Sequence, residues 1–134
     1  MSRRNYYPLQ KWGNIFLVQA AFGCQDPDLV VTAKLIVDTG ASYTVLSNRL
    51  MRTIAGANAI PLRQENIVTA SQRTTAPVIA TPWINCLGMQ IDAFPVVALT
   101  LPTNTMVDGL LGVDFMKRCK AVIDIDRAEI SVPD

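Results

Sequence analysis

The sequence predicts a single all-β domain with one or two short helices. Half of the 134 residues are hydrophobic and 17% are charged, which is the composition of a globular chain with its own core. About eight short runs rich in β-branched and aromatic residues follow one another along the chain. Turn residues separate these runs at hairpin-like spacing, which is typical of a β-sandwich or β-barrel.

The first elements are a hairpin and a third strand. Strands are expected over residues 14–22 and 29–38, because both runs are rich in β-formers and the turn cluster GCQDPD lies between them. After the small residues TGAS, residues 43–46 (YTVL) predict another short strand.

A short helix is expected over residues 47–56. Ser47 can accept a hydrogen bond at its start and Gly56 can end it. Its apolar side chains share one face, as an amphipathic helix requires: Leu50, Met51 and Ile54.

The next predicted element is a hairpin over residues 65–88, with its turn in SQRTT at 71–75. Pro77 and Pro82 cannot donate to a strand ladder, so they indicate a sheet edge or a projecting ribbon. Gly88 marks a turn, and residues 89–99 predict one further strand.

The last elements are a strand, a helical turn and a hairpin. Residues 106–112 (MVDGLLG) predict a strand and a tight turn, and residues 113–119 predict a turn or two of helix. The alternating residues 120–132 predict a closing hairpin that turns near Asp126 and Arg127.

Composition excludes several classes of function. The net charge of +1 argues against nucleic acid or an anionic membrane as a partner. The chain has no histidine, which excludes Ser-His-Asp and Cys-His catalysis and histidine-ligated metals. Three widely spaced cysteines argue against a disulfide framework and a zinc site, and indicate free thiols.

We see neither a signal peptide nor a membrane span in the sequence. We therefore expect a cytoplasmic protein, unless the chain is excised from a longer membrane-anchored or precursor protein.

The stretch VDTGAS contains the main candidate for chemistry. Asp38 ends an apolar strand, Gly40 permits a close backbone turn, and Thr39 and Ser42 supply hydroxyl groups nearby. Such a ring of donors can hold a partly desolvated carboxylate. The alternative is an ordinary Asx-type turn at a strand end.

The segment LIVDTGASYTVLS, at residues 35–47, is similar to the active-site segment of retropepsin-like aspartic proteases. The family's second landmark, two apolar residues and a glycine before a short helix, is matched by residues 110–112, Leu-Leu-Gly, ahead of VDFM. The resemblance covers nearly the whole chain from residue 14. It implies a retropepsin-like closed β-barrel with a flap hairpin over 14–134, preceded by an N-terminal arm or leader over 1–13.

The resemblance implies catalysis by two aspartates that share a proton. This chain has one Asp-Thr-Gly, so a second copy must supply the mate of Asp38 in a twofold homodimer. Thr39 would lock the two loops together across the axis, and Gly40 would present its carbonyl to a peptide substrate. Ser42 would bond the outer oxygen of Asp38, and Ala41 would support the loop.

The resemblance also implies roles away from that loop. The hairpin around residues 67–79 would close over the substrate, although many flaps have glycines at the tip and this one has none. Leu110 and Leu111 would enclose the carboxylate, and Gly112 would permit the close approach of the two segments. The residues expected near the flap tip are Ala70, Ser71, Gln72 and Arg73.

The function that these features predict is a homodimeric aspartic endopeptidase acting on peptides or proteins, without metal or organic cofactor. The first alternative is a catalytically weak or inactive module that uses the same fold for dimerisation or peptide binding. A third possibility is that the chain is one half of a longer two-lobed protease.

The arm at YYPL (6–9) could pack on a partner subunit or be a disordered leader, and we favour packing. Asp108 and Asp114 are expected to be structural.

Overall fold

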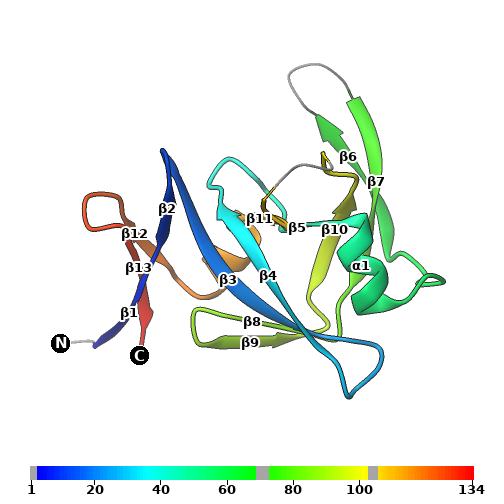
Figure 1. The fold of residues 1–134 in the computed structure, drawn as a ribbon, viewed down its shortest axis with the longest axis horizontal. Helices are drawn as coiled ribbons and strands as arrows, with labels where there is room; N and C mark the ends of the chain where they lie inside the picture. Colours follow the sequence, from blue (N-terminus) through cyan, green and yellow to red (C-terminus); the bar gives the residue numbers. More distant parts are fainter. Residues whose placement is uncertain (1–2, 69–72, 103–105) are drawn as a thin grey trace.

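The computed structural model describes residues 3–68, 73–102 and 106–134, which form thirteen strands and two helices (Figure 1). The strands are β1 (Arg4–Pro8), β2 (Gln10–Trp12), β3 (Ile15–Gly23), β4 (Val30–Val37), β5 (Val45–Ser47), β6 (Arg63–Val68), β7 (Arg73–Ala80), β8 (Trp83–Cys86), β9 (Met89–Asp92), β10 (Pro95–Leu99), β11 (Gly109–Leu111), β12 (Val122–Asp124) and β13 (Glu129–Pro133). The helices are α1 (Asn48–Ala55) and α2 (Val113–Arg118). The predicted all-β class is therefore confirmed.

The larger sheet carries the elements around the Asp-Thr-Gly loop. Its strand order is β6-β7-β10-β5-β11-β4-β3-β8-β9, and β2 pairs with β3 beside this path. Most pairs are antiparallel, but β11 runs parallel to β4 and β10 runs parallel to β5. Within the described residues the path keeps two open ends, so the predicted closure into a barrel is not confirmed.

A second sheet joins the two ends of the chain. Its strand order is β1-β13-β12, and the paired strands β1 and β13 lie side by side at the left of Figure 1. Residues 4–8 pair with β13 and residues 10–12 pair with β3, so most of the expected arm packs on its own chain. Its contact with a partner subunit and the domain boundary at residue 13 stay predictions.

The first predicted elements are confirmed. Strands β3 and β4 form the expected antiparallel hairpin. The Ser47 hydroxyl accepts the Leu50 N–H and so caps α1, and Gly56 ends the helix with a φ of 87°. Met51 and Ile54 point into the core, because the apolar stripe of a surface helix is the face that a sheet can bury.

Two predicted strand boundaries were wrong. Residues 89–99 form two strands, β9 and β10, because the chain turns at Ala93 and Phe94. Phe94 is buried, and its carbonyl accepts the Thr81 N–H. Of the predicted turn at 71–75, residues 73–75 belong to β7, and residues 71–72 lie outside the described residues. Pro77 does lie in a projecting ribbon, as β7 pairs with β10 only from Val78 onward.

Two hydrophobic clusters hold the elements together. The main core is formed by residues of the larger sheet, of β13 in the smaller sheet and of the two helices, and includes Leu35, Phe115 and Ile130. A smaller cluster lies under the β6/β7 hairpin and contains Val45, Ala76, Val78 and Val97. Both helices of the described part are far too short to cross a bilayer.

Candidate functional site

Asp38 follows directly after β4, in a turn that its own carboxylate organises. Its Oδ1 accepts the Gly40 N–H at 2.9 Å, and its carbonyl accepts the Ala41 N–H at 3.2 Å. This is the Asx-type turn that the sequence offered as the alternative, and it leaves the second carboxylate oxygen without a bond to the described residues. Asp38 is half-buried, whereas Thr39 and Gly40 are exposed. The carboxylate thus lies at the molecular surface and not inside the core of its own chain.

Strand β11 lies against this turn. The Asp38 N–H donates to the Leu111 carbonyl at 3.1 Å, which continues the parallel pairing of β4 with β11. Leu111 is fully buried in the main core, and Leu110 is half-buried against the smaller cluster. The two predicted motifs, about seventy residues apart, are therefore neighbours.

Gly112 permits the close approach of the two motifs. A Cβ atom at this position would lie 2.5 Å from the Tyr43 carbonyl carbon and 2.8 Å from the Thr44 nitrogen. Both are backbone atoms, which cannot move aside as a flexible side chain could. A glycine is required here because of the neighbouring backbone and not because of its own φ, which is −91°.

Thr44 and Asp114 form a polar link that the sequence did not indicate. The buried Thr44 hydroxyl donates to Asp114 Oδ1 at 2.8 Å and accepts the Gly112 N–H at 3.1 Å. Asp114 also accepts the Thr44 N–H at 3.0 Å and the Phe115 N–H at 2.8 Å. A threonine among apolar strand residues, with a carboxylate early in the second helix, was the only signal of this link in the sequence.

The remaining residues of the loop take different positions. The Ala41 carbonyl accepts the Val113 N–H at 2.9 Å, so it ties the loop to the start of α2. Ser42 is exposed, and its expected bond to Asp38 is not among the hydrogen bonds of the described residues. The contact expected from Thr39 involves a second copy and stays a prediction.

The β6/β7 hairpin lies on the same side of the molecule as the Asp38 loop. The loop after β4 and the far ends of β6 and β7 are all at the top of the view in Figure 1. Of the four residues expected near the flap tip, Arg73 begins β7, and residues 70–72 fall outside the described residues.

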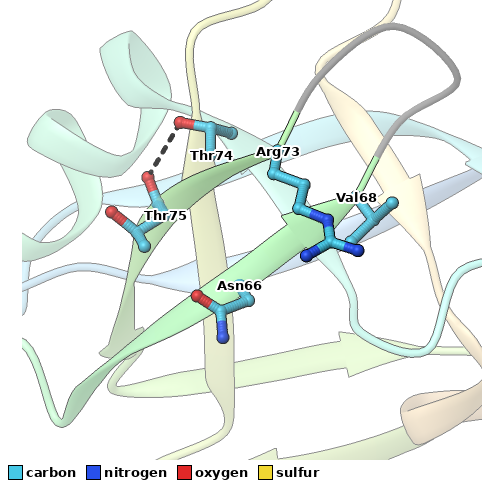
Figure 2. Close-up of a pocket in the computed structure, with 5 residues that line it drawn as sticks. All are labelled: Asn66, Val68, Arg73, Thr74 and Thr75. Atoms are coloured by element: carbon cyan, nitrogen blue, oxygen red, sulfur yellow. Dashed lines mark hydrogen bonds between the residues drawn. The ribbon is translucent and has the colours of Figure 1, made fainter.

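The hairpin carries a hollow of about 540 Å³ (Figure 2). In it, the Thr74 hydroxyl donates to the Thr75 carbonyl at 3.4 Å. The lining residues come from both strands: Asn66, Val68, Arg73, Thr74 and Thr75. Asp38 is not one of them, so this hollow is a feature of the hairpin itself.

The other reactive groups have structural surroundings. Asp108 accepts the Lys34 N–H at 2.8 Å and so fixes the chain before β11, which agrees with the structural role expected for it. Burial and the neighbouring Cys119 raise the pKa of the Cys86 thiol to about 12, so it stays protonated at neutral pH and is a poor nucleophile. Among the described residues, no group of three or more His, Cys, Asp or Glu side chains could hold a metal ion.

Comparisons with known proteins agree with this arrangement. A family model described as "Aspartyl protease" matches residues 26–115, a range that includes both motifs. No curated protein matches the chain. Among solved structures, the chain is similar to a retropepsin-like aspartic protease from Rickettsia conorii, with a TM-score of 0.68 and 18% identity over 99% of this chain and 93% of the other. At this identity the likeness establishes a retropepsin-like fold.

Proposed function

Because the chain belongs to the aspartyl protease family, whose model spans residues 26–115, we propose that it is an endopeptidase that acts as a homodimer. The observation that carries the proposal is the position of Asp38. The chain's single Asp-Thr-Gly forms an exposed turn whose half-buried carboxylate is anchored to β11 through the backbone. A twofold axis near this turn would bring Asp38 close to its own mate.

The chemistry would need only these two carboxylates and water. Two carboxylates so close together cannot both ionise readily, so the pair would hold one proton between them. The ionised aspartate would take a proton from the attacking water, and the protonated one would donate its proton to the carbonyl oxygen of the scissile peptide bond. Collapse of the tetrahedral intermediate would break the C–N bond and deliver a proton to the leaving amine. No metal or organic cofactor enters this scheme.

The neighbouring residues would position the substrate and the mate. Thr39, exposed beside Asp38, would contact its counterpart across the axis, and the exposed Gly40 would offer its carbonyl to an extended peptide. Ala41 and Ser42 would support the same loop. The β6/β7 hairpin, with Ala70 to Arg73 near its tip, would cover the peptide and exclude water. A peptide bound in this way pairs mainly through its backbone, and pockets for its side chains set the specificity.

The first test is cleavage of a diverse peptide pool by the wild-type chain and by Asp38→Asn. Asparagine keeps the size of the side chain but can neither ionise nor share the proton, so we expect cleavage to fall at least a thousand-fold, to the level of the blank. The matched control is Asp28→Asn, which removes an exposed carboxylate at the opposite end of β4 from Asp38. Cleavage by purified Asp38→Asn at the wild-type rate would refute the proposal.

The second test asks whether one site needs two chains. Wild type and Asp38→Asn are unfolded, mixed and refolded together at constant total concentration. If a mixed dimer is inactive, activity follows the square of the wild-type fraction, and an equal mixture retains about one quarter of it. A linear fall to one half would show that each chain works alone.

The alternative, a module that binds peptide or dimerises without cleaving, is motivated by the hairpin. No glycine occurs between Gly56 and Gly88, so the flap tip lacks the residue that most readily bends. A wild-type chain that sediments as a dimer and binds peptides, but leaves the pool intact, would establish this alternative.

A further inference from the structure

Tyr43 connects the loop of Asp38 with the base of the β6/β7 hairpin. Its backbone is fixed on one side, because Gly112 lies against its carbonyl and the next residue, Thr44, is bonded twice to Asp114. Its side chain is partly buried against the smaller hydrophobic cluster, to which the hairpin contributes Ala76 and Val78. Tyr43 therefore has its backbone in the segment that follows the Asp38 loop and its side chain against the hairpin.

Arg63, the first residue of β6, covers the Tyr43 ring. Its guanidinium carbon lies 5.9 Å from the ring centroid, which is within the range of a cation–π interaction. Its Nε donates to Glu65 Oε1 at 2.9 Å, and this ion pair fixes the guanidinium over the ring. Arg63 and Glu65 lie opposite Val78 and Ala76 in the ladder, so all four side chains share the face that meets Tyr43.

The hairpin depends on contacts at its base. Strand β7 has a third strand beside it only from Val78 to Ala80, where β10 pairs with it. Residues 64–68 and 73–77 beyond this point form a two-stranded ribbon within the described part of the chain. A ribbon of two strands is marginally stable by itself, so its orientation is determined where it joins the rest of the molecule. Tyr43, Arg63 and Glu65 are at that junction.

We propose that Tyr43 is a positioning residue that holds the hairpin over the Asp38 loop through its stacked contact with Arg63. The proposal rests on the proposed function, since it assigns the hairpin to substrate binding. The ring and the guanidinium do not touch the reacting atoms. Their loss therefore allows the hairpin to take more orientations and weakens peptide binding, while the chemical step is largely kept.

The size of the effect follows from the contact. A cation–π interaction at an exposed site is worth about 0.5–1 kcal/mol, which corresponds to about a two- to five-fold change in an equilibrium. Arg63→Ala should accordingly raise KM about two- to five-fold and change kcat by less than two-fold. Tyr43→Ala also removes packing against the smaller cluster, so its increase in KM should be larger.

The experiment measures kcat and KM with one peptide selected from the cleaved pool. The variants are Tyr43→Phe, Tyr43→Ala, Arg63→Ala and the double variant Tyr43→Ala/Arg63→Ala. Tyr43→Phe keeps the aromatic face and loses only the hydroxyl, which interacts with Arg63 and Glu65, so it should raise KM less than Tyr43→Ala. Arg63→Ala should have little further effect once Tyr43 is alanine. The control is Gln64→Ala, an exposed residue on the opposite face of β6.

Three results would overturn the proposal. They are an unchanged KM in Tyr43→Ala, a loss of kcat at constant KM, and strictly additive effects of the two alanine variants. Any of them would mean that the contact does not position the hairpin for binding.

A second measurement separates this proposal from the proposed function. Hydrogen exchange of the β6 and β7 amides needs no substrate, and it should be faster in Tyr43→Ala and Arg63→Ala than in Tyr43→Phe. If no peptide is cleaved but exchange follows this order, the proposed activity fails while the positioning contact stands. If peptides are cleaved but exchange is the same in all variants, the positioning proposal fails by itself.

Discussion

Replacing Thr44 by valine tests the polar link that holds the two halves of the site together. The two side chains have nearly the same shape, so the change removes the hydroxyl group and leaves no cavity. The hydroxyl donates to Asp114 Oδ1 at 2.8 Å and accepts the Gly112 N–H at 3.1 Å, and Thr44 is fully buried. The valine chain should fold, with a lower free energy of unfolding.

The expected loss can be worked out from these two bonds. A hydrogen bond to a charged group contributes about 1.5–3 kcal/mol, and a buried N–H left without a partner costs about 1–3 kcal/mol. Asp114 keeps the N–H groups of Thr44 and Phe115, so its carboxylate is not left unpaired. The added methyl group regains part of the loss by burial. We therefore expect Thr44→Val to lower the free energy of unfolding by about 3 kcal/mol.

The assay is equilibrium unfolding in urea at one protein concentration, since dimerisation would make stability depend on concentration. With a slope of about 2 kcal/mol per M, the midpoint should fall by about 1.5 M. Thr44→Ser keeps the hydroxyl, so its free energy of unfolding should fall by about 1 kcal/mol or less. Thr32→Val makes the same substitution at an exposed position on β4 and should change the free energy of unfolding little. A Thr44→Val chain within about 0.5 kcal/mol of wild type would refute the reasoning.

Two other predictions concern the backbone contact and the ion pair. Gly112→Ala places a Cβ atom 2.5 Å from the Tyr43 carbonyl carbon, so it should lower the free energy of unfolding by about 1–3 kcal/mol or more and abolish cleavage. Urea unfolding measures the first effect and the peptide assay measures the second. Wild-type values in both assays would contradict the close approach. The hydrogen bond from Arg63 lowers the pKa of Glu65 below its ordinary 4.5, so the stability that this ion pair adds is present above pH 4.5 and is lost as the pH falls through the lowered value. The difference in unfolding free energy between wild type and Glu65→Gln should therefore shrink as the pH is lowered from 6 to 3, and a constant difference over that range would count against the pair.

Local signals in the sequence predicted much of the fold and the core of the site. Ser47 and Gly56 mark the ends of α1 because a cap depends on one side chain or one backbone conformation. The Asp38 turn was found in the same way, because a carboxylate beside a glycine can bond its own backbone. The position of residues 110–112 beside it was implied by the resemblance to retropepsin-like proteases and by no local signal.

Features that depend on distant partners could not be predicted in this way. Thr44 and Asp114 are separated by seventy positions, and neither residue type indicates the other. The split of residues 89–99 depends on burial of Phe94 between packed elements, and the ring of Phe94 meets that of Phe115 edge to face at 5.7 Å. The stacking of Arg63 on Tyr43 likewise requires β6 to lie beside the smaller cluster.

The sequence by itself determined the β class, the absence of histidine chemistry, and a single Asp-Thr-Gly preceded by an apolar strand. These follow from composition and from steric rules that act over a few residues. Only the tertiary structure decided that Asp38 lies in an exposed turn bonded to β11, that Thr44 and Asp114 join the two motifs, and that the chain's own ends pair in one sheet. The physical reason is that hydrogen-bond partners and burial are set by which distant segments come together, and no local pattern in the chain encodes that choice.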